Sequence, residues 1–169
     1  MGLYLIPNGP SPTTAAQAAV TTGTSIKTLL QVKASATNTI KIKEWGISFD
    51  GSAAATPIKC ELLETDVAAT VTASVAADIV KLDGLALANG DQTTNLIPVG
   101  TTSTGYTSSS EGSITATRMF DVQFIAPTNQ YVKQFPLGLE PVIQVSKFAR
   151  IRVTAGAAVN AYCYMIVEV

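Results

Sequence analysis

The sequence has no histidine and few charged residues, and these two shortages argue against several classes of function. Without histidine, the 169-residue chain lacks the side chain that most often serves as a general base or a metal ligand. Charged residues make up only 14% of the chain, against roughly 25% in ordinary soluble domains. A surface this poor in charge indicates a chain that covers itself with partners.

Basic stripes and catalytic motifs are also missing. The 11 basic and 12 acidic residues form no run of like charge, so nothing matches the phosphate backbone of a nucleic acid. Arg150 and Arg152 come closest, and we interpret them as a solvated strand face. No nucleophile elbow or phosphate-binding loop occurs. The carboxylate pairs Glu61/Glu64 and Asp83/Asp91 stand where strand ends and turns are expected. We therefore predict no enzyme, no catalytic residue, no cofactor and no metal.

The two cysteines and the hydrophobic pattern bear on the cellular compartment. Cys60 and Cys163 each stand within an apolar pattern, which favours buried free thiols over a disulfide, although distant strands could bring the two together. The N-terminus has no basic region typical of a signal peptide. No apolar run approaches the roughly 20 residues that span a bilayer. We expect a protein made in a cytoplasm, without a membrane partner.

Alternation of apolar and polar residues predicts an all-β chain. Ile58, Cys60 and Leu62 alternate with charged residues, as the segments 120–124 and 150–153 also do. Between residues 40 and 49 the apolar positions change parity, which predicts a β-bulge or a bend near residues 44–46. Residues 67–75 fit a strand better than a helix because of their β-branched content. The polar segment 101–110 is either a long loop or a short strand between loops.

The last strand is apolar on both faces. Residues 155–158 predict a hairpin turn into a strand over 162–169. One face carries Cys163, Met165, Val167 and Val169, and the other carries Tyr162, Tyr164 and Ile166. Such a strand is typical of the centre of a sheet covered on both sides. Its second face would be covered either by a neighbouring subunit or by a loop.

Residues 1–24 hold one short apolar run followed by three prolines, and we interpret them as an extended arm or a frayed terminus. Residues 25–169 then form a single β-sandwich domain, jelly-roll-like because short strands alternate with Gly/Pro-rich turns. The candidate partner contacts are the apolar tip of the arm and the outer face of the last strand: Leu3, Tyr4, Leu5, Ile6, Tyr162 and Tyr164.

Five stretches of strand and turn are distinctive: residues 20–32, 43–51 with the sequence KEWGISFDG, 113–118, 125–131 and 149–155. Together they resemble a family of small structural proteins of tailed phages that infect actinobacteria. The resemblance covers most of the chain from residue 20 on. It implies a virion protein on the outer capsid surface: a decoration, or cement, protein that binds the major capsid protein, bridges its subunits and stabilises the shell, with trimers at three-fold positions.

Two other functions stay open on the sequence. The family is also described as minor structural or tail proteins, so a tail or head-fibre location is the first alternative. The second is a carbohydrate-binding β-sandwich that contacts a host-surface glycan. In such a module Tyr106 or Tyr131 would be the exposed aromatic, because Trp45 alternates with Ile47 and Phe49 and is expected in the core.

Overall fold

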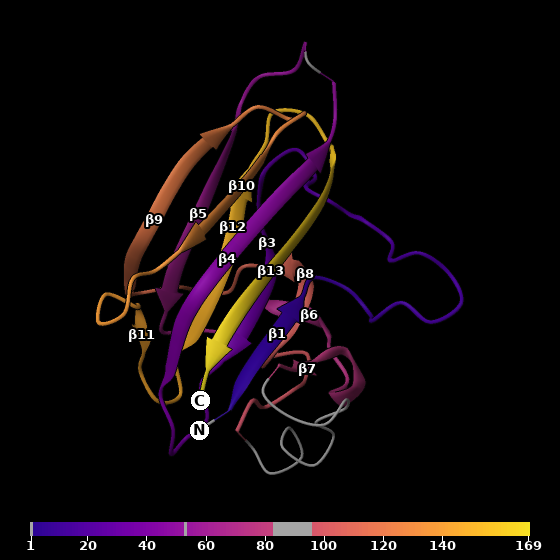
Figure 1. The fold of residues 1–169 in the computed structure, drawn as a ribbon. Coiled ribbons are helices and arrows are strands. Elements are labelled where there is room, and N and C mark those ends of the chain that lie inside the picture. The colour runs from indigo at the N-terminus through magenta and orange to yellow at the C-terminus, as the bar shows by residue number, and fades with distance from the viewer. Residues whose placement is uncertain (1, 53, 83–95) are drawn as a thin grey trace.

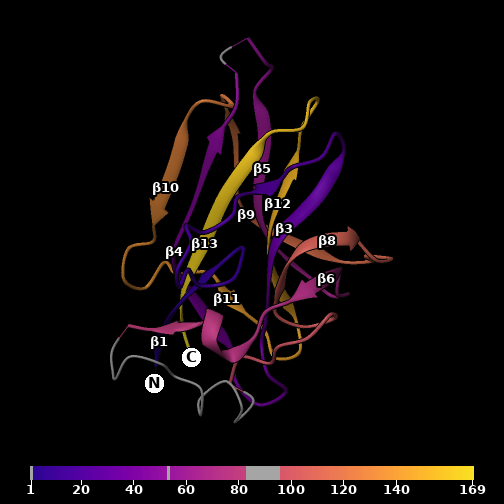
Figure 2. The same ribbon diagram turned by 90° about the vertical axis from the view of Figure 1, so that its right-hand side faces the viewer.

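A computed structural model of the chain describes residues 2–52, 54–82 and 96–169, and these form two antiparallel β-sheets. Sheet A has the order β10-β4-β13-β1-β7, with β11 paired to β4 and β2 to β13; sheet B has the order β6-β8-β3-β12-β5-β9. The two sheets form separate layers in a sandwich-like arrangement (Figures 1 and 2). The all-β prediction is confirmed for the described residues.

The elements follow the chain in a simple order. Sheet A contains β1 (Leu3–Pro7), β2 (Val20–Thr21), β4 (Ile40–Asp50), β7 (Val80–Lys81), β10 (Gln130–Gln134), β11 (Val142–Ile143) and β13 (Asn160–Glu168). Sheet B contains β3 (Ile26–Lys33), β5 (Ile58–Thr65), β6 (Thr70–Ala73), β8 (Gly105–Ser110), β9 (Thr117–Ile125) and β12 (Phe148–Thr154). A single short 3₁₀ turn, η1 (Ala76–Asp78), interrupts the described strands.

One hydrophobic core lies between the sheets. Alternate residues of each strand face it because successive side chains in a strand point to opposite faces. Trp45 and Met165 from sheet A and Leu62 and Ile151 from sheet B are completely buried there. Cys60 on β5 and Cys163 on β13 belong to the same core and are free thiols, as expected. Burial raises the pKa of Cys60 to about 12 and holds that of Cys163 well above its ordinary value.

Strand β4 contains the predicted β-bulge. Ile166 of β13 faces Glu44 and the next residue, Val167, faces Ile42, so Lys43 has no partner on β13. The extra residue changes the parity of the strand. Ile42 before the bulge and Trp45 after it therefore both reach the core. The bulge lies at the edge of the predicted 44–46 window.

Strand β13 is central in sheet A, between β4 and β1, as its two apolar faces predicted. Its connection to β12 differs from the expectation. Residues 155–158 do not close a hairpin, because β12 pairs with β3 and β5 in sheet B whereas β13 pairs with β4 and β1 in sheet A. The turn instead carries the chain from one sheet to the other.

The N-terminal segment also differs from the expected arm. Residues 3–7 form β1, which pairs with β13 on one side and with β7 on the other. Pro7 is tolerated because it ends the strand. Asn8 then continues the pairing: its backbone N–H donates to the carbonyl of Cys163, and its side-chain Oδ1 accepts from the Cys163 N–H. Only residues 9–19 form an irregular extension, which reaches away from the sheets in Figure 1.

In sheet B two further expectations are changed, and one of two stated alternatives is confirmed. Strand β6 covers only part of the predicted strand 67–75, and residues 76–78 form η1. The segment 101–110 contains the short strand β8. On β9 the alternation is present, but the exposed aromatic is Phe124, at 73%, whereas Asp121 is buried. The turn signals of residues 83–95 lie outside the described residues.

Candidate functional site

The predicted contact residues separate into two groups. Tyr4 and Ile6 point into the core and are buried, so they are not available to a partner in this fold. Leu3 and Leu5 alternate with them and are half-buried on the outer face of sheet A. Tyr162 and Tyr164 lie half-buried on the same outer face of the neighbouring β13.

The pairing of strands brings these outer residues together. Leu5 faces Ile166, and Pro7 faces Tyr164 across β1 and β13. On the other side of β13, Tyr162 faces Ser48 and Tyr164 faces Gly46 of β4. Beyond β4 lies β10, where Val132 faces Gly46 and Gln130 faces Ser48. The outer face of sheet A is thus a mostly uncharged surface across four strands.

A shallow hollow of about 270 Å³ lies on this surface. We call it the tyrosine hollow, and it is lined by Ile47, Ser48, Gln130, Val132, Tyr162 and Tyr164. The two tyrosine rings have centroids 6.3 Å apart and an interplanar angle of 37°. They form a gently bent aromatic surface beside the polar side chains of Ser48 and Gln130.

Tyr164 lies over Gly46, and its orientation is fixed. A Cβ at residue 46 would lie 2.6 Å from Cε1 of the Tyr164 ring, so only glycine leaves room for the ring above β4. The Tyr164 hydroxyl donates to Glu44 Oε1, and Gln134 Nε2 donates to Glu44 Oε2 at 2.6 Å. Burial and the neighbouring Glu44 carboxylate raise the pKa of Tyr164 to about 12. The phenol therefore stays neutral at physiological pH.

A second surface feature is the turn between β10 and β11, which sequence reasoning missed. We call residues 135–141 the apolar loop. Leu137 is 93% and Leu139 is 71% exposed, and Met119 on the neighbouring sheet B is exposed as well. The signal that could have identified it is Leu-Gly-Leu between Pro136 and Pro141, because this pattern places a tight turn with apolar residues on either side of its glycine.

The apolar loop is ordered by hydrogen bonds and ion pairs. Leu139 N–H donates to the Pro136 carbonyl at 2.9 Å across Gly138, whose φ of +87° favours glycine. The Glu140 carboxylate accepts from the Gly138 N–H at 2.6 Å and from Lys43 Nζ at 2.9 Å. The hydrogen bond from Lys43 and the backbone donors lower the pKa of Glu140 to about 2. Lys43 also pairs with Glu168.

Asp121 is a buried carboxylate between the edges of the two sheets. It accepts hydrogen bonds from the Trp45 indole at 3.2 Å, the Tyr131 hydroxyl at 2.9 Å and the Gln123 amide at 3.0 Å, and Lys133 Nζ lies 3.4 Å away. Burial alone would raise its pKa, but these donors outweigh burial and lower it. All of these donors belong to the protein itself, so we interpret the Asp121 carboxylate as a structural group. Tyr131 is thereby directed inward, away from the role considered for an exposed aromatic.

Arg150 is buried, contrary to the predicted solvated strand face. Its side chain is 0% exposed because the segments around Val67 and Glu111 cover it. Arg150 Nη1 donates to Glu111 Oε2 at 3.2 Å, and Nη2 donates to the Val67 carbonyl. Glu111 also accepts from Thr28 N–H and from the Ser108 hydroxyl, each at 2.6 Å. Arg152 pairs with Glu61 at 2.9 Å.

The remaining candidate groups are paired within the protein. Glu61 is bonded to Lys59 and Arg152, and Glu64 to Arg118, so this carboxylate pair presents no free acid. Asp83 and Asp91 lie outside the described residues. Among the residues that the structure does describe, no cluster of three or more metal-ligating side chains is present. No helix there is long and apolar enough to cross a membrane.

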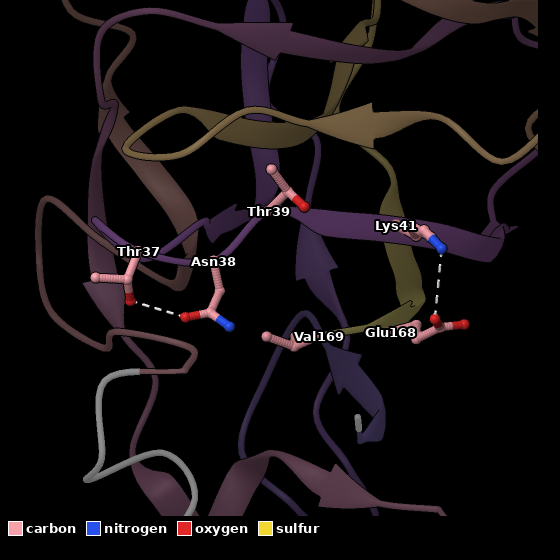
Figure 3. Close-up of a pocket in the computed structure, with 6 residues that line it drawn as sticks. All are labelled: Thr37, Asn38, Thr39, Lys41, Glu168 and Val169. Atoms are coloured by element: carbon pink, nitrogen blue, oxygen red, sulfur yellow. Dashed lines mark hydrogen bonds and ion pairs between the residues drawn. The ribbon is translucent and has the colours of Figure 1, made fainter.

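One further hollow lies where β4 begins and β13 ends (Figure 3). It is lined by Thr37, Asn38, Thr39, Lys41, Glu168 and Val169. Lys41 Nζ lies 3.7 Å from Glu168 Oε1, and Thr37 Oγ1 donates to Asn38 Oδ1 at 2.7 Å. Its charged groups thus pair with each other, and this hollow carries no functional assignment.

Comparisons with known proteins add no assignment: no protein-family model, curated protein or solved structure matches this chain. Only the residues and the geometry of the chain itself therefore bear on its function.

Proposed function

We propose that the chain is a jelly-roll sandwich that acts as a structural binding protein, a capsid decoration protein on the outside of a tailed-phage head. The strand order supports the architecture. When β2, β6, β7, β8 and β11 are set aside, eight of the described strands remain. In chain order, they are arranged first-eighth-third-sixth in sheet A and second-seventh-fourth-fifth in sheet B. A jelly roll, which consists of two Greek keys, would have this order, and the order therefore supports the proposed architecture.

The apolar loop is the observation that supports a structural binding role most directly. Leu137 and Leu139 leave most of their surface exposed, yet Glu140 and the Pro136 carbonyl hold their turn in one conformation. A pre-ordered apolar tip loses little conformational entropy when it enters a pocket on a partner. We propose that it docks on the major capsid protein.

Two further features support decoration of a shell. The low charge leaves surface for contact with copies of the same chain, so the proposal includes a homotrimer. Residues 9–19 extend from the sheets, and most of them are exposed, so this extension replaces the longer arm as the segment that reaches a neighbouring subunit. Binding to the assembled shell but not to its free subunits stabilises the shell by mass action, and three contacts per trimer add through avidity.

The test uses purified protein and tailed-phage heads that lack it. We expect the protein to sediment with the heads and to raise the temperature at which they disrupt. The double variant Leu137→Ser with Leu139→Ser should weaken binding at least about tenfold, because both apolar anchors are lost. Val75→Ser is the matched control, since Val75 is also an exposed aliphatic residue, 58% exposed, but lies away from the loop.

Two measurements separate the alternatives. Wild-type protein that does not bind heads, or a double variant that binds as well as wild type, would contradict the proposal. Antibody labelling of intact virions separates a head location from a tail or head-fibre location. Light scattering after size exclusion gives the native mass, and a monomer would remove the trimer from the proposal while leaving head binding to be judged by sedimentation.

A further inference from the structure

The tyrosine hollow offers aromatic and hydrogen-bonding side chains that take no part in the proposed docking of the apolar loop. The two features lie at opposite ends of β10: the hollow includes Gln130 at the start of the strand, and the apolar loop begins after Gln134 at its end. They can therefore serve different partners. A ligand of the hollow would bind whether or not the apolar loop docks on a capsid.

The floor of the hollow is aromatic and held in place. Tyr164 leans over Gly46 and is held by Glu44, so its ring lies along the sheet instead of standing away from it. Tyr162 continues the surface two residues earlier on β13, with its ring centroid 6.3 Å from that of Tyr164. A ring fixed in this way offers its face to a flat apolar surface without first losing conformational freedom.

The rim of the hollow has unused hydrogen-bonding capacity. Within the described part of the chain, the Ser48 hydroxyl, the Gln130 amide and the Tyr162 hydroxyl make no hydrogen bond, although all three side chains line the hollow. An amide offers both donors and an acceptor, and a hydroxyl offers either. Polar groups left free beside an aromatic floor are typical of small-molecule sites, where a few polar groups fix orientation.

The charge and size of the hollow restrict the ligand. None of its six lining side chains is charged, so an anion or a cation would find no counter-charge there. Its volume of about 270 Å³ is just below the roughly 300–1,000 Å³ of drug-sized sites. A pyranose ring fits this combination: its axial C–H groups form an apolar face that packs on an aromatic ring, and its equatorial hydroxyls project toward the rim.

We propose that the tyrosine hollow is a glycan-binding site for neutral pyranose sugars. Tyr162 and Tyr164 stack against the sugar rings, and Ser48 and Gln130 bond to their hydroxyls. Gly46 makes the site possible because it allows Tyr164 to lie flat. Tyr162 and Tyr164 provide the exposed aromatic surface that the sequence suggested at Tyr131. The Tyr131 hydroxyl is instead bonded to Asp121.

The test is a binding screen of the full chain against immobilised neutral oligosaccharides of glucose, galactose and mannose, with uronic-acid and sialylated glycans alongside. Hits are measured in solution by calorimetry with the same oligosaccharide. We expect binding to neutral glycans, and a loss of about tenfold or more in Tyr162→Ala and Tyr164→Ala. Tyr162→Phe, which keeps the ring, should lose only a few-fold.

Two controls keep the result specific. Tyr106→Ala removes a half-buried tyrosine on β8, outside the hollow, and should leave binding unchanged. Gln130→Ala changes an exposed side chain, so a loss of affinity in this variant cannot be attributed to unfolding, and circular dichroism checks every variant. No binding to any neutral glycan, equal binding by wild type and Tyr162→Ala, or loss on Tyr106→Ala alone would overturn the proposal. None of these outcomes bears on sedimentation with phage heads.

Discussion

The outer faces of the two sheets are covered very differently. On sheet A, Tyr162 and Tyr164 stay half-exposed, Tyr164 above Gly46, and the hydroxyl of Tyr162 has no partner among the described residues. On sheet B, the segments around Val67 and Glu111 cover β12, and a fully buried Arg150 is bonded to both of them. The chain itself covers the outer face of sheet B at β12, whereas the outer face of sheet A stays partly exposed at β13.

This difference shows that a polar side chain on the outward face of a central strand can either stabilise the fold or remain accessible to a partner. Arg150 and Tyr164 each lie on the outward side of a central strand of their sheet. The guanidinium is out of water, so its partners must be supplied by the fold. The Tyr164 hydroxyl makes one hydrogen bond, to Glu44, and part of the side chain stays exposed to solvent. Substitutions on sheet B should therefore affect folding, and substitutions on sheet A should affect binding.

The largest effect is expected for Arg150→Met. Removing the cation leaves the half-buried Glu111 carboxylate without its ion pair and the Val67 carbonyl without its donor, which we expect to cost about 3–5 kcal/mol of unfolding free energy. Arg152→Met is the matched control on the same strand. Its partner Glu61 keeps Lys59, so the expected cost is about 1 kcal/mol. Chemical denaturation measures both, and equal losses would refute the distinction between the two arginines.

A smaller effect is expected from acid. Burial alone would raise the pKa of Glu111, but the hydrogen bonds from Ser108 and Thr28 and the charge of Arg150 lower it in the folded state. A lowered carboxyl pKa contributes stability that is complete above the ordinary value of 4.5 and is lost as the pH falls through the folded value. Unfolding measured from about pH 7 to about pH 3 should thus show falling stability below the ordinary carboxyl pKa.

Glu111→Gln tests which carboxyl is responsible. This variant should be less stable than wild type at neutral pH, by about 1.5–3 kcal/mol for the lost charge-assisted bonds, and should lose less on acidification. Glu61 and Asp121 also have lowered pKa values, so part of the slope will remain. Asp50→Asn is the control, because Asp50 is exposed and makes no ion pair among the described residues. An unchanged acid slope in Glu111→Gln would remove Glu111 from the explanation.

The smallest effect on stability is expected for Gly46→Ala on the open face. The new Cβ would lie 2.6 Å from Cε1 and 2.9 Å from Cζ of Tyr164. The end of a side chain can move, so we expect a cost of about 1 kcal/mol. The ring must then lift from β4, and glycan retention should fall with a change in the near-ultraviolet circular dichroism of tyrosine. Gly156→Ala, where the nearest atom is 3.4 Å away, is the control and should change neither.

Local alternation predicted what depends on a single strand. The bulge in β4 and the central position of β13 could both be inferred from the sequence. The change in the alternation of apolar residues in β4 and the apolar residues on both faces of β13 are each visible within one short stretch of the chain. The burial of Arg150 could not, because it depends on Glu111, which is 39 residues away. Phe124 and Asp121 show the same limit: alternation gives two faces of β9 but not which one meets the core.

The site was predictable only in part for the same reason. Tyr162 and Tyr164 were identified from the two apolar faces of β13, but Ser48, Gln130 and Gly46 join them only through strand pairing. Residues 3–6 are all apolar, so they showed no alternation, and the prolines after them suggested an arm. Their place beside β13 depends on pairing between the two ends of the described chain.

The unpaired Lys43 in β4 has a consequence for how this sequence can change over time. One extra residue keeps Ile42 and Trp45 on the same side of a single continuous strand. Replacing Lys43 alters only the contacts of its side chain with Glu140 and Glu168. Deleting it would remove the bulge and leave a regular strand in which Ile42 and Trp45 still face the core, whereas deleting any one residue after it would turn part of the strand over. Natural length variation should therefore accumulate in residues 9–19 and, within β4, be tolerated only at the bulge.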